Sequence, residues 1–210
     1  MARWLLLDTA TPVAVVGLYD LGSDLDSSAV VVEVVLDVPQ RHAEALPAAV
    51  ERALAHGAVD GIGVGVGPGS FIGVRTGIAF AKGLARARGV PLVGIPTLQA
   101  LVASCDVTGA VTAVIDAKRG EVYVQSFVDG VAVDDARACV AADVSGVTAP
   151  RSGPSLAGMG RVLRQVLASQ PGRDERGSLV PVYVRAPDAK LPAVDPRAGL
   201  ASVAGVLEGA

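Results

Sequence analysis

GIGVGVGPGSFIGVRTG, at residues 61–77, is the stretch that decides how this chain is built. Its first part, Gly61–Val66, predicts a buried strand, and Gly67–Ser70 predicts a turn. A helix is expected to follow from about Val74 to Arg88. A glycine turn in front of a helix leaves backbone N–H groups that attract anions. The stretch is therefore either a phosphate cradle or a tight turn in which strand and helix pack closely.

Three sharper motifs are absent from this stretch. No Lys-Ser or Lys-Thr follows the glycines, so the turn is not a Walker A loop. No register gives G-x-G-x-x-G, which excludes the dinucleotide-binding fingerprint. Ser70 has Pro68 and Ile72 two residues to either side, so it does not form the G-x-S-x-G elbow of a hydrolase.

Small residues recur every four positions from the turn into the helix, at Gly73, Gly77, Ala81 and Ala85. Glycine inside a helix costs about 1 kcal/mol relative to alanine. Close packing should offset that cost, either against the chain's own sheet or against a helix of a partner.

The rest of the first half continues the same alternation of strand and helix patterns. Three apolar runs predict an antiparallel meander, at residues 4–7, 13–19 and 30–38. A helix is expected over 43–54, and after the glycine turn and its helix come a strand over 92–95 and a helix over 96–104. The order β-β-β-α-β-α-β-α predicts an α/β fold, a mixed sheet with helices on both faces, over residues 1–105.

Residues 106–210 predict a smaller C-terminal lobe, completed by a helix at the end of the chain. Strands are expected at residues 111–115, 121–128 and 181–185, and helices at 156–169 and 200–207.

Asp8 ends the first predicted strand, and hydroxyl side chains follow it in the turn at Thr9 and Thr11. Sugar kinases and actin-like ATPases place an aspartate and hydroxyls in this way near nucleotide phosphates and Mg²⁺. The alternative is a plain turn whose polar side chains satisfy backbone groups. On the nucleotide interpretation, six residues face the phosphates: Asp8, Thr9, Thr11, Gly67, Gly69 and Ser70.

Composition excludes several classes of protein. Hydrophobic residues make up 51% of the 210 residues and charged residues 19%, which excludes a disordered chain. The net charge of −3 argues against a basic surface that binds nucleic acid by itself. No apolar run approaches the roughly 20 residues of a membrane span, and Trp4–Leu7 is too short for a signal-peptide core. We therefore expect a cytoplasmic protein without membrane attachment.

Candidates for catalysis are scarce. The two histidines, His42 and His56, have no companions that would complete a metal site, and the two cysteines, Cys105 and Cys139, have no histidine nearby in sequence. No Ser/His/Asp arrangement can be nominated. The sequence therefore predicts neither a catalytic residue nor a bound metal.

Taken together, several segments resemble the TsaB (YeaZ) family. The matching segments are LLLDTAT (5–11), RHAEALPAAV (41–50), GVGPGSFIGVRTGIAFAKGLA (65–85), IPTLQAL (95–101), DAKRGEVYVQ (116–125) and PVYVRAPDAKLP (181–192). One departure is Ile72, where the family usually has threonine. The resemblance implies the actin/hexokinase/Hsp70 ATPase fold, a ribonuclease H-like architecture, and a relationship to glycoprotease-like proteins.

The resemblance also implies a role in forming N6-threonylcarbamoyladenosine beside the anticodon of tRNA. In that pathway the catalytic subunit, TsaD, binds metal through an H-x-x-x-H pair after the fifth strand. Thr97 and Leu101 occupy those places here, and a leucine cannot ligate a metal. The implied role is a non-catalytic partner of TsaD in a heterodimer, with the ATPase TsaE as a third subunit. The resemblance also implies that two predicted helices meet the equivalent helices of TsaD, through Ala43, Leu46 and Val50 and through the small-residue row from Gly73 to Ala85. It would need no cofactor of its own, would bind nucleotide only at an interface and would meet tRNA only through the complex.

Three questions stay open at this level. The runner-up function is a stand-alone nucleotide-dependent phosphotransferase of the same fold, which the small second lobe disfavours. A glycoprotease has neither ligands nor a nucleophile to support it. The sequence also leaves open whether the chain forms a homodimer when it is alone.

Overall fold

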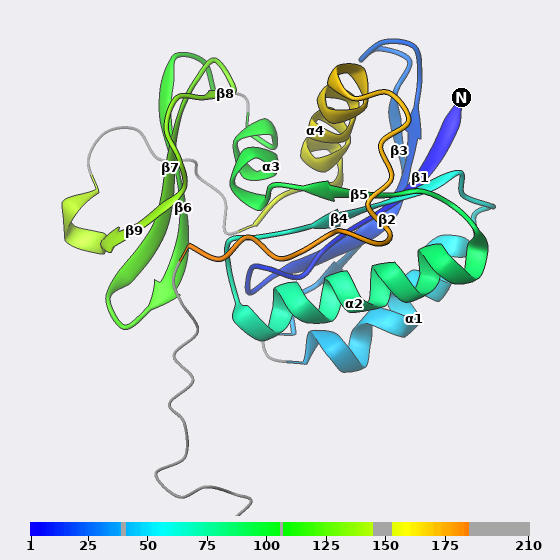
Figure 1. Cartoon of the computed structure of the whole chain (residues 1–210), viewed down its shortest axis with the longest axis horizontal. Coiled ribbons are helices and arrows are strands. Elements are labelled where there is room, and N and C mark those ends of the chain that lie inside the picture. Colours follow the sequence, from blue (N-terminus) through cyan, green and yellow to red (C-terminus); the bar gives the residue numbers. More distant parts are fainter. Residues whose placement is uncertain (39–40, 106, 145–152, 185–210) are drawn as a thin grey trace, which may run out of the picture.

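The computed structural model describes residues 1–38, 41–105, 107–144 and 153–184. Its central sheet has five strands, β1 (Ala2–Asp8), β2 (Ala14–Leu21), β3 (Ala29–Leu36), β4 (Gly61–Gly65) and β5 (Leu92–Ile95) (Figure 1). Their order is β3-β2-β1-β4-β5. The first three strands form the predicted antiparallel meander, and β4 and β5 run parallel to β1.

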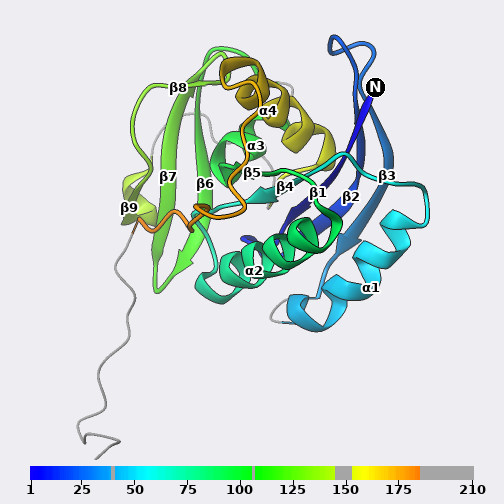
Figure 2. The same cartoon turned by 45° about the vertical axis from the view of Figure 1, so that its right-hand side comes forward.

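Helices cover both faces of this sheet. α1 (His42–Leu54) and α2 (Phe71–Arg88) lie side by side on one face, and α3 (Thr97–Ala103) and α4 (Leu156–Ser169) lie on the other (Figure 2). Because side chains alternate along a strand, β1 sends Leu5 and Leu7 toward α1 and α2, and Trp4 and Leu6 toward α3 and α4. This arrangement confirms the predicted ribonuclease H-like, actin-like fold.

The glycines of β4 make room for large side chains of β1. A β-carbon on Gly61 would lie 2.5 Å from the Trp4 ring, and one on Gly63 would lie 2.6 Å from Leu6. The alternating glycines of this strand therefore leave space for the core between the sheet and helices α3 and α4.

α2 begins three residues before the predicted start. The Ser70 hydroxyl accepts a hydrogen bond from the Gly73 N–H at 3.2 Å and caps the helix. At the other end, Gly89 adopts a left-handed conformation with φ of 69°. The helix thus runs directly from the glycine turn.

A second, antiparallel sheet lies beside α3 (Figure 1). It contains β6 (Ala110–Lys118), β7 (Glu121–Val128), β8 (Val131–Ala132) and β9 (Arg137–Val140), followed by a short 3-10 helix at Ala141–Asp143. Leu98 and Leu101 of α3 pack with Val111 and Phe127 of this sheet in one buried cluster. α3 therefore contacts both sheets.

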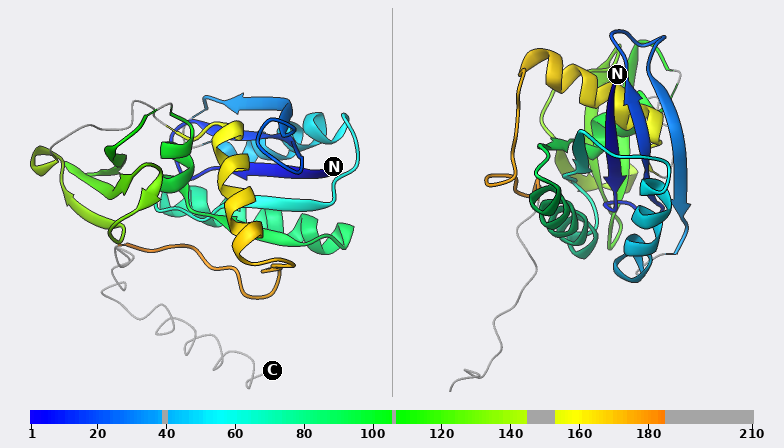
Figure 3. Two further views of the ribbon diagram at one scale, coloured as in Figure 1. Left: turned by 90° about the horizontal axis from the view of Figure 1, so that it is seen from above. Right: turned by 90° about the vertical axis from the view of Figure 1, so that its right-hand side faces the viewer.

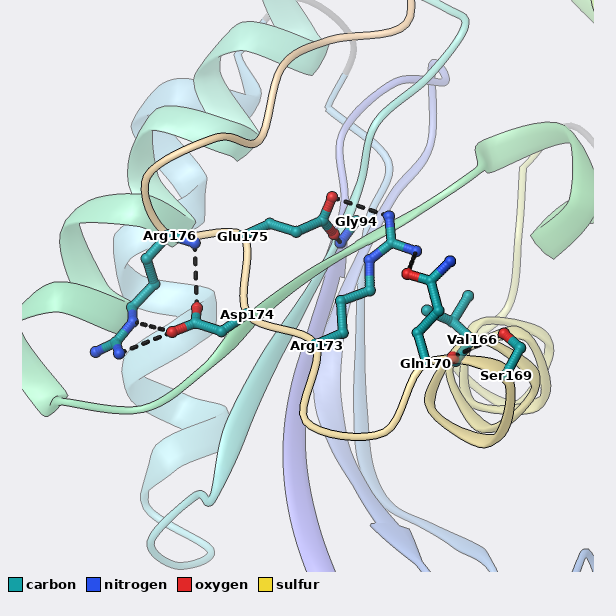
Figure 4. Close-up of polar contacts among 8 residues, drawn as sticks. All are labelled: Gly94, Val166, Ser169, Gln170, Arg173, Asp174, Glu175 and Arg176. Carbon is teal, nitrogen blue, oxygen red and sulfur yellow. Dashed lines mark hydrogen bonds and ion pairs between the residues drawn. The ribbon is translucent and has the colours of Figure 1, made fainter.

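The chain then returns to the first sheet, where α4 crosses the strands (Figure 3). Residues 173–184, here called the strap, continue along β5, the edge strand (Figure 4). Asp174 Oδ1 accepts the Leu92 N–H at 3.2 Å, and Glu175 Oε2 accepts the Gly94 N–H at 2.8 Å. An ion pair of 2.9 Å to Arg173 holds Glu175 in place. Side-chain carboxylates thus satisfy N–H groups of an otherwise open sheet edge.

The predicted division into lobes 1–105 and 106–210 stays a prediction, although α4 and the strap both pack on the first sheet. The strand expected at 181–185 is not formed in residues 181–184, where Val182 N–H donates one backbone hydrogen bond to Val66 at 2.9 Å. The helix expected at 200–207 lies outside the described residues. Within the described ranges, no helix has the length and apolar character that a membrane crossing requires.

Candidate functional site

Asp8 is fully buried at the end of β1, and both of its carboxylate oxygens accept hydrogen bonds. The Ala10 N–H donates to Oδ1 at 2.7 Å, and the Thr97 hydroxyl donates to Oδ2 at 2.7 Å. Burial raises the pKa of Asp8 from 3.8 to about 6, although both hydrogen bonds oppose that shift. The side chain that would face a nucleotide's Mg²⁺ is instead enclosed by the protein.

Thr97 links Asp8 to the glycine turn. Its hydroxyl also accepts the Gly67 N–H at 3.1 Å, and its own N–H donates to the Gly67 carbonyl at 3.0 Å. A β-carbon on Gly65 would lie 1.9 Å from Asp8 Oδ2, so β4 needs glycine there. The ends of β1 and β4 and the start of α3 are therefore joined by one buried polar network.

The two threonines of the turn after β1 are also used inside the fold. The Thr9 hydroxyl donates to the Gly73 carbonyl at 2.7 Å, and the Thr11 hydroxyl donates to the Val13 carbonyl at 2.7 Å. Both side chains are almost completely buried. These bonds match the alternative in which the polar residues of the turn satisfy backbone groups.

The backbone of this turn fills the space in front of α2. The Ser70 N–H donates to the Ala10 carbonyl at 2.7 Å. A β-carbon on Gly69 would lie 2.3 Å from that same carbonyl oxygen, and one on Gly73 would lie 2.1 Å from the Thr9 oxygen. The structure thus places all six residues predicted to face phosphates in two adjoining turns, but their hydrogen bonds go to other groups of the chain, among them Ala10, Gly73 and Thr97. Their contacts favour the tight-turn interpretation, and nucleotide binding by them stays a prediction.

The row of small residues on α2 faces the chain's own sheet. Ala81 and Ala85 belong to the buried core, and a β-carbon on Gly77 would lie 2.4 Å from the Thr9 hydroxyl oxygen. Six of the seven residues predicted at a partner interface are buried in this way: Leu46, Val50, Gly73, Gly77, Ala81 and Ala85. We correct that prediction, because only Ala43 is exposed and a buried side chain offers no surface to a partner.

The opposite face of α2 carries a second small-residue row, Ala79, Gly83 and Ala87, and all three are exposed. A β-carbon on Gly83 would meet no atom within 4 Å. The helix also carries four basic residues and no acidic one: Arg75, Lys82, Arg86 and Arg88. The sequence contained this second row at the same four-residue spacing, but the spacing does not tell which row faces inward.

One surface cluster was not predicted. Arg75 of α2 lies over the ring of Phe71, 3.7 Å from its centre, and its Nε donates to the Tyr183 hydroxyl at 2.6 Å. Tyr183 belongs to the strap, 108 residues further along the chain. No sequence pattern links residues at that separation.

Metal-ligating side chains do not gather in the described part of the chain, which holds no group of three or more His, Cys, Asp or Glu suited to a metal ion. Thr97 and Leu101, at the places of the TsaD ligand pair, are both fully buried. His42 lies at the start of α1, with Nε2 3.0 Å from the Pro12 carbonyl oxygen. It therefore has a backbone partner beside the turn after β1.

Comparison with known proteins matches this chain to one family model and to several relatives. Residues 36–153 match the family model described as TsaD, tRNA N6-adenosine threonylcarbamoyltransferase. An uncharacterized protein of Mycobacterium tuberculosis H37Rv is 34% identical over 215 aligned residues, covering 90% of this chain and 95% of the relative. The tRNA threonylcarbamoyladenosine biosynthesis protein TsaB of Escherichia coli K12 is 44% identical over 68 residues, 31% of this chain and 29% of that protein.

The fold has a close structural counterpart. A crystal structure from Pseudomonas aeruginosa, described as an uncharacterized protein with similarity to peptidase YEAZ, matches with a TM-score of 0.74 at 24% identity. The match covers 88% of this chain and 100% of that chain. Together with the TsaD family model and the TsaB relative, this places the chain in the glycoprotease-like family that includes TsaD and TsaB (YeaZ).

Proposed function

We propose that this chain serves the biosynthesis of N6-threonylcarbamoyladenosine in tRNA as a non-catalytic partner of a TsaD-type transferase. The observation that carries the proposal is the environment of Thr97 and Leu101. These residues stand where the resemblance puts the metal ligands of TsaD, and both are buried. Thr97 is committed to Asp8 and Gly67, and Leu101 packs against the second sheet. A chain with this pair needs a partner to supply the metal chemistry.

The proposed contact surface is the outer face of α1 and α2. On α2, the exposed row of Ala79, Gly83 and Ala87 allows another helix to approach closely. On α1, Glu44 and Glu51 are exposed beside Arg52, so this helix carries mixed charges, whereas the charged residues of α2 are all basic. A partner built on the same fold can set its own two helices against this pair.

Nucleotide chemistry is assigned to the other subunits. The polar groups at the end of β1 and in the glycine turn have hydrogen-bond partners within the chain, and the backbone of the turn after β1 lies where an anion would approach α2. We therefore propose that nucleotide binds, if at all, only at the interface with TsaD. TsaE remains the proposed source of ATP hydrolysis.

Reconstitution tests this function. TsaD and TsaE from the same organism are supplied with tRNA, an activated threonylcarbamoyl donor and ATP, with and without this chain. We expect modified adenosine to form only when the chain and TsaD are both present, and neither modification nor ATP turnover by the chain alone. ATP turnover by the isolated chain, or full modification without it, would contradict the proposal.

A further inference from the structure

Arg75 is held rigidly at the surface by two aromatic rings. Its guanidinium carbon lies 3.7 Å from the centre of the Phe71 ring and 5.4 Å from that of Tyr183. The two rings lie 5.6 Å apart, and the Nε–H donates to the Tyr183 hydroxyl at 2.6 Å. Stacking and this hydrogen bond fix the side chain before any ligand arrives.

The outer end of the Arg75 guanidinium has no hydrogen-bond partner among the residues that the structure describes. Among the described residues, Arg75 makes no hydrogen bond other than the one through Nε, so the N–H groups of both terminal nitrogens stay available. Arginine binds a carboxylate or phosphate through two parallel N–H···O bonds in this geometry. The excess of basic residues on α2 raises the local preference for an anionic partner.

Apolar side chains surround this charge. Ile72 is 74% exposed, Phe71 40%, Val182 43% and Tyr183 44%. An arginine among exposed aromatic and aliphatic residues has the composition of the centre of a protein interface. RNA is contacted mainly through phosphates and stacked bases, for which exposed Ile72 and Val182 offer nothing. The surroundings therefore favour a protein over RNA.

We propose that Arg75, clamped between Phe71 and Tyr183, is the anchor of the TsaD interface and receives an Asp or Glu carboxylate of TsaD. This inference rests on the proposed function. It also gives the strap a second role, because Tyr183 orients the arginine while residues 173–175 cover the edge of the sheet.

Titration of TsaD with the full chain tests the inference. Arg75→Ala should weaken binding about 30-fold or more, as expected for a central anchor. Arg75→Lys keeps the positive charge but loses the paired N–H donors of the guanidinium, and it should weaken binding at least 10-fold. Tyr183→Phe keeps the ring but loses the hydroxyl, and a loss of about 3- to 10-fold is expected. Arg161→Ala, on α4 at the opposite face of the sheet, is the control: it removes an exposed arginine outside the proposed contact surface and should change affinity less than 3-fold.

Equal losses for Arg75→Ala and Arg161→Ala would overturn the role of Arg75 as an anchor, as would no loss for Arg75→Ala. Because Arg75 is exposed, each variant should keep the wild-type melting temperature. Binding lost by Arg75→Glu should be restored by one Asp→Lys or Glu→Lys change in TsaD. If none of these changes restores binding, the partner of Arg75 is not a TsaD carboxylate. Loss of tRNA binding by Arg75→Ala with unchanged TsaD binding would place RNA there instead. If the wild-type chain does not bind TsaD at all, the proposed function itself fails.

Discussion

Both faces of α2 carry small residues, but those of the inner face pack against the rest of the chain and those of the outer face are exposed. On the inner face, Gly73 and Gly77 lie so close to Thr9 that a β-carbon would collide with it. On the outer face, Gly83 has no neighbour within 4 Å of the position that a β-carbon would take. Glycine on the inner face is required by the fold of this chain alone, whereas glycine on the outer face is not. An outer glycine that the described fold does not require fits the proposed contact with a partner.

The largest effect is expected from Gly73→Ala. The added β-carbon would lie 2.1 Å from a backbone oxygen, which cannot move aside as a flexible side chain can. We expect a loss of about 3 kcal/mol or more in the free energy of unfolding, at the upper end of overpacking costs. Urea unfolding measures it. A Gly73→Ala protein as stable as the wild type would contradict the tight packing of the turn against α2.

The pH dependence of the free energy of unfolding tests whether Asp8, beside the inner face of α2, is closed to solvent. Because the pKa of Asp8 is raised from 3.8 to about 6, the folded state holds this proton more tightly than the unfolded state. Stability should therefore fall as pH rises from about 4 to above 6, by up to about 3 kcal/mol. The free energy of unfolding, measured at intervals across this range, should show the decline in the wild type and not in Asp8→Asn.

Carboxylates with lowered pKa values, such as Asp20 and Asp174, have the opposite pH dependence. Their contribution is lost as pH falls below about 4, so it does not obscure the window in which Asp8 titrates. If the wild type and Asp8→Asn respond identically between pH 4 and 7, Asp8 is open to solvent. In that case the turn after β1 would again be a candidate to receive a nucleotide.

The smallest effect is expected from Gly83→Ala, the same substitution on the outer face. Alanine favours the helix over glycine by about 1 kcal/mol, and none of the described residues opposes the added methyl group. We expect a rise in the melting temperature of about 2–4 °C for a chain of this size. A fall would mean that the outer face packs against another part of the protein.

Much of the fold was predictable because it depends on local patterns. Apolar runs at β1 and β2 and helical spacing from Leu46 to Leu54 identify the strands and helices of the first sheet, whatever their partners. The position of the glycine turn was also predicted correctly, because the residues from Gly67 to Ser70 favour a turn and separate the strand pattern from the helix pattern.

What the sequence did not reveal is direction and long-range contact. α2 has a small-residue row on each face, so its spacing alone could not show that Ala81 points inward and Gly83 outward. Asp8 and Thr97 meet across 89 residues, and Arg75 and Tyr183 across 108. The strap was predicted in part as a strand, but it binds the edge of β5 largely through side-chain carboxylates.

The most direct test of the partner role is a titration of TsaD with two leucine variants of α2. Gly83→Leu adds bulk to the outer row, where the isolated chain has room, so its melting temperature should not fall while its affinity for TsaD drops roughly 5- to 150-fold. Ala81→Leu adds bulk to the core, so its melting temperature should fall, while the protein that remains folded binds TsaD with little change. Unchanged affinity of Gly83→Leu for TsaD would contradict a partner contact through the outer face of α2.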